Sequence, residues 1–340
     1  MMSSVEQART SSRAPAAPEG RDRKPLVSVI MPAYNTAAYI AESVDSVLDQ
    51  DYPGIELIVV DDGSTDGTLD ILRGYGDRLT LLTQQNQGAA VARNAGVARA
   101  GGDYIAFIDS DDVWLPGKVA AQVDYMDQHP GIGMTFTAWA TWKPDPSGTF
   151  LKPDAAKGAY PMNPDGKPLV DRGSGWLYNR LLFGSLPHTI TVMMRRDLVE
   201  RVGQFDPDLK RGQDYDYWLR ASRLTEIHQL NLVTALYRLH GEGCITKYPD
   251  TNYEFEVVRK ALGRWGRVGP GGEQTSRGAI RRRLAETCFS FGYHHYWEGD
   301  PRLAARSFLQ STLRDPWSVS TWAYLVLSAG KSLAGRGKAR

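Results

Sequence analysis

The first half of the chain alternates short apolar runs with segments whose apolar residues recur at helical spacing. Four runs are nearly continuous, which is typical of strands buried on both faces: 26–31, 57–60, 79–82 and 104–108. Helical patterns lie between them, at 40–48 and in the alanine-rich stretch 89–100. Strands separated by helices predict an α/β fold with a mostly parallel, Rossmann-like sheet covered by helices on both faces.

Polar and acidic residues follow the ends of three of these strands. Asn35 follows the first strand, Asp61 and Asp62 end the second, and the run Asp109–Asp112 ends the fourth. In such sheets ligands bind outside the carboxyl ends of the strands. Three carboxylates within four residues repel one another, so a divalent cation with a bound phosphate is their natural partner. An isolated acidic turn is also compatible with a solvated loop. Three loops that carry polar or acidic residues at one edge of the sheet instead favour a binding site for a nucleotide diphosphate.

The composition and the absence of two nucleotide-binding motifs narrow the range of possible functions. The 340 residues carry 40 Lys and Arg against 39 Asp and Glu, which gives no sign of a nucleic-acid partner. Cys244 and Cys288 lie far apart without metal-ligand spacing, as in a reducing compartment. No phosphate-binding GxxxxGK[ST] occurs, and no GxGxxG follows the first strand. No apolar run reaches the ~20 residues that span a bilayer, so we expect a cytoplasmic protein, either free or peripheral on the inner face of the plasma membrane.

Four motifs then occur in a fixed order along the chain, at 27–35 (VSVIMPAYN), 59–68 (VVDDGSTDGT), 85–96 (QNQGAAVARNAG) and 107–112 (FIDSDD). Together they resemble the family 2 glycosyltransferases, and the resemblance extends over about 26–240. It implies a GT-A fold, a nucleotide-sugar donor and inversion at the anomeric carbon. The first 25 residues are rich in Ser, Ala, Pro and Arg and predict a disordered arm at 1–25. The resemblance then places a GT-A domain at 26–250, with its donor half at about 26–115 and its acceptor half at about 116–250, and the change of pattern beyond it predicts a C-terminal helical region at 251–340.

The resemblance assigns donor contacts to nine residues: Pro32, Ala33, Tyr34, Asn35, Asp61, Asp62, Arg93, Asp109 and Ser110. Asp61 would bind the nucleotide base, and we expect one of Asp61 and Asp62 to be a structural cap or turn residue instead. Arg93 would approach a phosphate or form a structural salt bridge.

The metal site follows from the same motifs. Asp111 would ligate Mn²⁺ or Mg²⁺ directly, because its ligand atoms are hard oxygens. Asp112 would support the metal from behind, and His240 would complete the coordination shell, bind the diphosphate or be structural.

The acceptor half requires a general base, and the resemblance points to Asp214. Gln213 stands where the family usually has Glu, which removes a charge beside the base. Asp216 is the fallback base, although two residues further along a helix it should point away from Asp214. A structural alternative makes Asp214 a helix N-cap. His188 and Trp218 are further acceptor-side or support residues.

Two more features of the sequence bear on the acceptor. Four aromatic residues are available to stack on sugar faces or to pack in the core: Trp139, Trp142, Trp176 and Tyr178. The C-terminal region has a helical-hairpin pattern with a stripe at Ala305, Phe308, Leu309 and Leu313, followed by a basic amphipathic helix. This end either packs on the domain or lies on an anionic membrane surface.

The sequence therefore predicts an inverting, metal-dependent glycosyltransferase that moves a sugar from a nucleotide-diphosphate sugar to a saccharide or lipid-linked acceptor, in bacterial-type surface polysaccharide synthesis. Two alternatives stay open. A nucleotidyltransferase also uses carboxylates and metal, but it usually carries a glycine-rich, basic loop after its first strand. A non-catalytic nucleotide-sugar-binding protein is compatible with Gln213.

Overall fold

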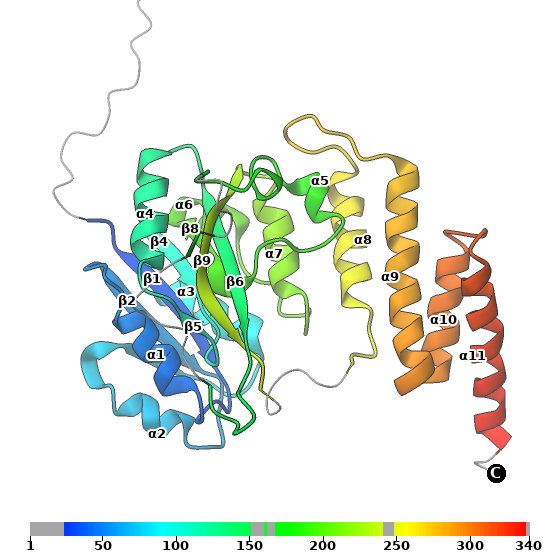
Figure 1. Cartoon of the computed structure of the whole chain (residues 1–340), viewed down its shortest axis with the longest axis horizontal. Helices are drawn as coiled ribbons and strands as arrows, with labels where there is room; N and C mark the ends of the chain where they lie inside the picture. The colour runs from blue at the N-terminus through cyan, green and yellow to red at the C-terminus, as the bar shows by residue number, and fades with distance from the viewer. Residues whose placement is uncertain (1–23, 151–159, 162–166, 241–247, 338–340) are drawn as a thin grey trace, which may run out of the picture.

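A computed structural model describes residues 24–150, 160–161, 167–240 and 248–337 (Figure 1). The predicted N-terminal arm lies outside the described residues except for positions 24 and 25, and Cys244 lies outside them as well. Nothing about the arm or about that thiol is therefore tested.

One mixed sheet forms the centre of the molecule. Its strands run in the order β3 (Thr80–Thr83), β2 (Ile55–Asp61), β1 (Val27–Ala33), β4 (Tyr104–Phe107), β8 (Met193–Arg195), β6 (Met134–Trp142), β9 (Ile227–Arg238) and β5 (Val113–Trp114), with β7 (Tyr160–Pro161) also paired to β9. The first four are parallel, β8 is antiparallel to both β4 and β6, and β9 is parallel to β6. The carboxyl ends of β6 and β9 therefore lie at the same edge as those of β1, β2 and β4.

Helices cover both faces of this sheet (Figure 1). The helices of the domain are α1 (Ile40–Leu48), α2 (Thr68–Arg73), α3 (Ala89–Arg99), α4 (Lys118–Gln128), α5 (Tyr178–Leu181), α6 (Arg196–Val202) and α7 (Gln213–Ala221), and α8 (Tyr253–Trp265) packs against α7. Successive residues of β1 enter different cores, since Val29 packs in one buried cluster and Ile30 in the other. The alanine-rich helix α3 lies close to the sheet at Gly96, where a Cβ would lie 2.5 Å from Ile30.

The first strand extends further than its sequence suggests. The apolar run predicted a strand that ends at Met31, before Pro32, yet β1 continues to Ala33 in register with β2. The backbone groups of Ile30 face β4, because its carbonyl accepts a hydrogen bond from the amide of Ile108. The backbone of Pro32 faces the same side as that of Ile30. It lies beyond Phe107, the last residue of β4 that pairs with β1. The missing N–H of proline therefore breaks no ladder hydrogen bond.

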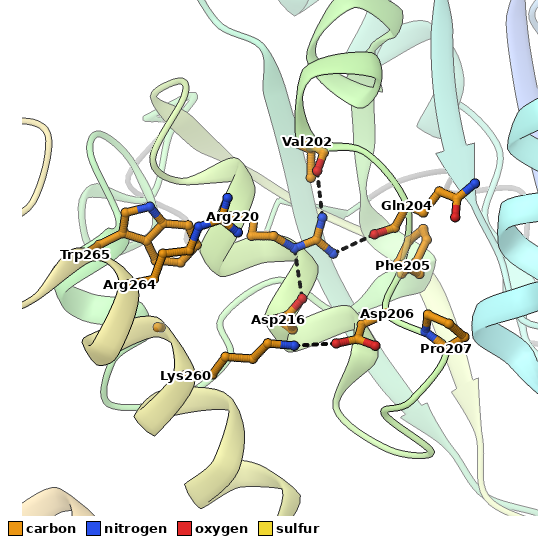
Figure 2. A pocket seen from close by; sticks show the side chains of 11 residues that line it. Val202, Gln204, Phe205, Asp206, Pro207, Asp216, Arg220, Lys260, Arg264 and Trp265 are labelled. Atoms are coloured by element: carbon orange, nitrogen blue, oxygen red, sulfur yellow. Dashed lines mark hydrogen bonds and ion pairs between the residues drawn. The ribbon is translucent and has the colours of Figure 1, made fainter.

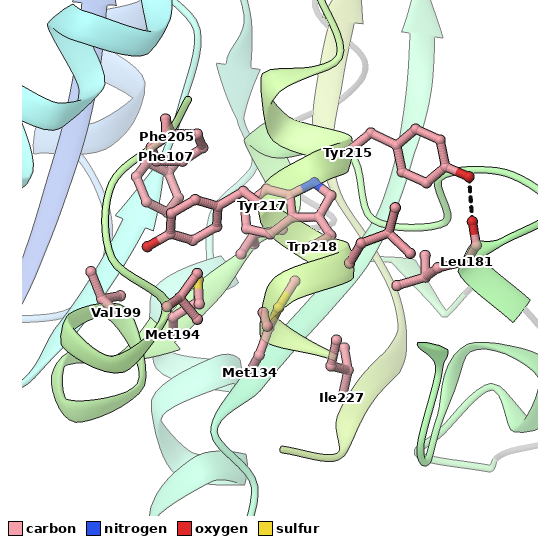
Figure 3. Close-up of a cluster of buried hydrophobic side chains, with 14 of the residues drawn as sticks. Phe107, Met134, Leu181, Met194, Val199, Phe205, Tyr215, Tyr217, Trp218 and Ile227 are labelled. Carbon is pink, nitrogen blue, oxygen red and sulfur yellow. Dashed lines mark hydrogen bonds between the residues drawn. The ribbon is translucent and has the colours of Figure 1, made fainter. Parts of the chain in front are cut away.

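The aromatic residues of α7 lie in the core (Figure 3). Trp218 is fully buried, and its ring centroid lies 6.2 Å from that of Phe107. Tyr217 stacks on Phe205 at 4.0 Å. The expectation that Trp218 contacts an acceptor is wrong, because no solvent reaches the side chain. Its support role is packing that fixes α7 against the sheet.

Three helices follow the domain side by side: α9 (Arg277–Glu298), α10 (Pro301–Thr312) and α11 (Val319–Gly337) (Figure 1). The predicted apolar stripe of α10 is wrong for Leu309 and Leu313, which are exposed. Small and polar residues are buried instead, because Ser307 and Ser311 donate hydrogen bonds of 2.7 and 2.8 Å to backbone carbonyls of α9. Hydroxyl groups satisfied in this way permit close helix contact without an apolar seam.

The last helix, α11, likewise buries polar residues and exposes apolar ones. Thr321 and Ser328 of α11 face inward, whereas Trp322, Val326 and Leu327 are exposed. Among the helices of the described residues, none is long and apolar enough to cross a bilayer.

Candidate active site

Side chains from distant parts of the chain meet at the carboxyl edge of the sheet. Nε2 of His240, after β9, lies 2.9 Å from Oδ2 of Asp111, after β4. Arg93, on α3, lies 2.6 Å from Asp109. The residues predicted to hold the diphosphate end of a donor are thus neighbours in space.

The two carboxylates after β2 have different surroundings. Asp62 accepts three hydrogen bonds of 2.7–2.9 Å, from the side chain of Gln84 and from the backbone amides of Gln87 and Gly88. Asp61 accepts one weak bond of 3.3 Å from the Ser64 amide, and its buried Oδ1 has no partner. Asp62 is therefore occupied in holding the loop before α3, while Asp61 has an oxygen available for a ligand.

The loop after β1 is braced against the loop after β2. Asn35 has a left-handed φ of 52°, and its side chain accepts a 2.8 Å bond from the amide of Thr65. The Ala33 carbonyl accepts from the Asp62 amide, and Pro32 lies inside β1. Tyr34 remains half exposed at 47%. Of the four predicted contacts here, Tyr34 and Asn35 are exposed to solvent, whereas Pro32 and Ala33 are buried.

Arg93 is a buried cation with spare donors. Its Nη2 bonds to Asp109, its guanidinium lies 5.8 Å from the ring of Phe205, and Nε and Nη1 have no partner. Ser110 is buried beside it, and its carbonyl accepts a 3.0 Å bond from Ser43 on α1. The sequence offered a salt bridge or a phosphate contact for Arg93, and the geometry allows both together.

The acidic loop has a shortage of positive charge. Burial, together with the charge of Asp109, raises the pKa of Asp111. Burial and the same neighbouring carboxylates raise the pKa of Asp112 to about 9, so this fully buried acid is protonated at neutral pH. A divalent cation would relieve both effects.

The donor atoms fit such a cation. Adjacent ligands of an octahedral ion, each at about 2.1 Å, lie about 3.0 Å apart, close to the 2.9 Å between Asp111 and His240. In the described part of the chain, no group of three or more His, Cys, Asp or Glu side chains could hold a metal by itself. Magnesium is usually bound through one or two carboxylates plus substrate phosphates, and Asp111 is the carboxylate of this pair.

Arg238 is a residue that the sequence reasoning missed. Its backbone amide donates to Asp112, its Nε to the carbonyl of Asp111, and its Nη2 to Glu42 on α1 at 2.5 Å. The guanidinium lies 4.3 Å from the ring of Trp142. It thus anchors the acidic loop to β9. A charged residue in an otherwise apolar strand pattern, two positions before His240, was the available sign.

On the acceptor side, Asp214 lies near the start of α7. Its Oδ2 accepts a 3.2 Å bond from the hydroxyl of Thr189, a residue whose part the sequence did not reveal. Gly212, not Asp214, is the residue that caps α7, so the N-cap alternative is wrong. Gln213 has a buried Oε1 without a partner and lines a pocket of about 420 Å³ at the start of α3.

Asp216 points away from this region, as helical spacing predicted. Its carboxylate lies 2.8 Å from Nε of Arg220, in a separate pocket of about 310 Å³ between α7 and α8 (Figure 2). In the same pocket Lys260 is paired with Asp206. Asp216 is therefore unsuitable as a fallback base.

His188 lies between the two halves of the site. It is within electrostatic range of Asp109 and Asp214, and its Nδ1 is buried without a partner. Burial lowers the pKa of His188, so the ring is neutral at pH 7. After His188, Thr189–Thr191 form a 3-10 turn, η4, in which the Thr191 hydroxyl donates to the His188 carbonyl, and strand β8 begins at Met193.

The chain is similar in sequence to known proteins. The family model for glycosyl transferase family 2 matches residues 28–149. A Bacillus subtilis (strain 168) glycosyltransferase named for teichuronic acid biosynthesis, TuaG, is 38% identical over 204 residues, or 58% of this chain and 71% of that protein. An uncharacterised glycosyltransferase of Rickettsia prowazekii is 32% identical over 216 residues, and the match spans 64% of each chain.

The fold has a solved counterpart. The crystal structure of S. aureus TarS 1–349 in complex with UDP-GlcNAc superposes with a TM-score of 0.61 at 22% identity, covering 93% of this chain and 92% of that one. This likeness confirms the predicted GT-A fold with its C-terminal helices. Together with the identity to TuaG, the order of the motifs and the geometry of the acidic edge, it shows that the chain is an enzyme of the family 2 glycosyltransferases.

Proposed function

We propose that this glycosyltransferase is inverting and metal-dependent, and that it transfers one sugar from a nucleotide-diphosphate donor to a hydroxyl of a saccharide or lipid-linked acceptor in surface polysaccharide synthesis. The observation that carries the proposal is the pairing of Asp111 with His240 beside Asp109 and Arg93, with Asp214 held by Thr189 across from them. The name of TuaG supports a polysaccharide product. Family membership leaves the nucleotidyltransferase alternative without support.

The donor would bind along the carboxyl edge from β2 to β4. The unpartnered Oδ1 of Asp61 would accept a hydrogen bond from a base N–H, which uracil, thymine and guanine offer. Tyr34 would cover the base, and the two free nitrogens of Arg93 would meet a phosphate oxygen or the sugar. The UDP-GlcNAc complex of TarS supports a uridine donor as the first one to test.

Asp111 and His240 would hold Mn²⁺ or Mg²⁺, with Asp112 behind them. When bound, the cation neutralises the diphosphate and stabilises the charge of the departing nucleotide. Arg238 keeps these side chains in place by fixing the loop to β9.

The general base in this proposal is Asp214. The acceptor hydroxyl gives its proton to the Asp214 carboxylate while its oxygen bonds to the anomeric carbon, and the bond from that carbon to the diphosphate oxygen breaks. The nucleoside diphosphate leaves with the electron pair, and attack from the opposite face inverts the configuration. Thr189 would orient the carboxylate through its 3.2 Å hydrogen bond.

The C-terminal helices are proposed to rest on an anionic membrane surface. Trp317 is 90% exposed, and Val319 and Val326 are exposed as well. Residues 301–337 contain five Arg and Lys against one acidic residue, Asp315. Exposed aromatic and aliphatic groups combined with cations are typical of interfacial helices.

The proposal is tested by donor turnover. The chain is incubated with Mn²⁺ and each of a panel of UDP- and GDP-sugars, and release of nucleoside diphosphate is measured with and without a mixture of bacterial glycolipids. We expect release from at least one donor, with a loss of about 100-fold or more in Asp111→Ala. Asp214→Asn should keep donor binding and lose acceptor-dependent release.

Asp124→Asn is the matched control, because Asp124 is an exposed carboxylate on α4. Full release in Asp111→Ala would refute the metal assignment, and transfer by Asp214→Asn would refute the base. Donor binding by the wild-type chain without any release would favour the non-catalytic alternative.

A further inference from the structure

Three aromatic rings from separate parts of the chain form a cluster that we name the aromatic platform. Trp139 comes from β6, Tyr237 from β9, and His188 from the turn before η4. Their ring centroids lie 5.1 Å (Trp139 to His188), 5.4 Å (Trp139 to Tyr237) and 5.2 Å (His188 to Tyr237) apart. Although its ring contacts both others, Trp139 keeps 39% of its surface exposed.

The platform lies on the acceptor side of the acidic loop. In the sheet order, β4 and β8 separate β6 and β9 from β1 and β2, where the nucleotide base is proposed to bind (Figure 1). Thr189, the residue after His188, donates to Asp214. A group on the platform would therefore be next to the proposed base and on the far side of the carboxylates from the nucleotide.

We propose that the aromatic platform is the acceptor subsite and that it binds the terminal pyranose ring of the acceptor through an apolar C–H face. The inference rests on the proposed function and deepens it by naming where the acceptor lies. One face of a pyranose presents C–H groups with partial positive charge, which are complementary to the negative face of an aromatic ring. The hydroxyl groups at the rim of the same sugar would be left to polar partners.

The charge of the platform selects a neutral sugar over a phosphate. The pKa of His188 is lowered by burial, so none of the three rings is cationic at pH 7. An acceptor phosphate would therefore find no ionic partner among them. The partnerless Nδ1 of His188 is instead suited to a sugar hydroxyl, because buried polar atoms are normally satisfied.

Burial distinguishes Trp139 from other aromatic residues suggested by the sequence. Tyr178 is fully buried and Trp142 is 5% exposed, packed against Arg238. Neither can offer a ring face to a sugar without unpacking the core. Trp139 has both a supported ring and solvent-accessible surface, as a stacking residue requires.

Saturation-transfer difference NMR tests the inference without knowledge of the natural acceptor. The probes are the methyl glycosides of glucose, galactose and N-acetylglucosamine, each added to the full chain with UDP and Mn²⁺. We expect saturation of pyranose C–H protons by the wild-type chain. Trp139→Ala should bind the glycosides about tenfold more weakly, whereas the UDP signals stay unchanged.

Two further variants keep the result interpretable. Trp139→Phe retains a ring and should keep the glycoside signals at reduced strength, and thermal unfolding shows whether either variant is misfolded. Trp297→Ala, which removes a 59% exposed Trp far along the chain, should change nothing. Glycoside signals that persist in Trp139→Ala, or that no wild-type sample shows, would overturn the inference. Loss of UDP signals in the wild-type sample would instead count against the proposed donor site.

Discussion

The carboxyl edge of the sheet and the C-terminal helices differ in the groups that they leave without partners. At the edge, buried polar atoms lack hydrogen bonds: Asp61 Oδ1, Arg93 Nε and Nη1, Asp112 Oδ2, His188 Nδ1 and His240 Nδ1. In the helices, the buried polar atoms Arg283 Nε and Ser328 Oγ lack partners among the described residues, but large apolar side chains also face solvent: Leu313, Trp317, Val319, Val326 and Leu333. An unmet buried polar group costs about 1–3 kcal/mol, and exposed apolar area about 25 cal/mol per Å². In both regions, a partner that satisfies or covers these groups would therefore bind with a favourable free energy.

The difference indicates what each partner must be. At the edge, hydrogen bonds of Asp62, Asn35 and Arg238 hold the loops in place. Buried polar atoms beside them lack hydrogen-bond partners. A polar, anionic ligand with its cation would satisfy those atoms. The helices bury hydroxyl groups and present apolar ones, so an apolar surface would satisfy them. Three predictions test this contrast.

The largest effect is expected from Arg238→Met. The substitution leaves Glu42 and the carbonyl of Asp111 without their buried donor. We expect the free energy of unfolding to fall by about 3 kcal/mol, measured by urea denaturation followed by circular dichroism. Arg238→Lys, which keeps the charge, should lose less. Arg264→Met, at an exposed position of α8, is the control, and an equal loss there would show that Arg238 has no special role.

Much of the fold was predictable because its patterns are local. Continuous apolar runs predicted β1–β4, and helical spacing predicted α1 and α3 within a few residues. The sequence misled where tertiary contacts decide. Pro32 stays in its strand because the neighbouring strand ends before it, and Leu309 and Leu313 are exposed because serine hydroxyls bond to the backbone of α9. Neither cause is visible in a linear pattern.

The donor edge was easier to predict than the acceptor side for the same reason. Its carboxylates stand in compact motifs directly after strands, so topology alone brings Asp61 and Asp111 to one edge. Arg238, Thr189 and Trp139 belong to no motif, and their positions depend on pairing between β6, β9 and η4. Long-range pairing of this kind carries no local sequence mark.

The second prediction compares Asp61 with Asp62. Asp62→Ala removes three hydrogen bonds from the loop before α3 and should lower the free energy of unfolding by about 2 kcal/mol. Asp61→Ala removes one weak bond together with a buried carboxylate oxygen that has no partner, so it should leave the free energy of unfolding unchanged or raise it slightly. Calorimetric titration with UDP should show the reverse order, with binding about tenfold weaker in Asp61→Ala. Unchanged UDP affinity in Asp61→Ala would refute its role in base recognition.

Smaller changes in stability are expected from two substitutions on α11. Val326→Ser alters an exposed side chain of α11 and should change the free energy of unfolding by less than about 0.5 kcal/mol. Trp322→Ser also removes the 2.9 Å hydrogen bond from the indole to the Pro316 carbonyl, so it should cost about 1 kcal/mol. The double variant should nevertheless lose most of its cosedimentation with vesicles of phosphatidylglycerol and phosphatidylcholine. The wild-type chain should bind these vesicles less at high salt, because its cations contribute.

The control for the helices is Phe308→Ser, whose side chain is fully buried in α10. That substitution should destabilise the helical region by about 3 kcal/mol or more, because it removes a core aromatic residue. Equal vesicle binding by the wild-type chain and the double variant would exclude the exposed face of α11 from membrane contact. If the double variant instead converted a dimer to a monomer in sedimentation velocity, the same face would belong to a second copy of the chain. Neither result would affect the unpartnered polar groups at the carboxyl edge of the sheet, which the nucleotide-sugar donor is proposed to satisfy.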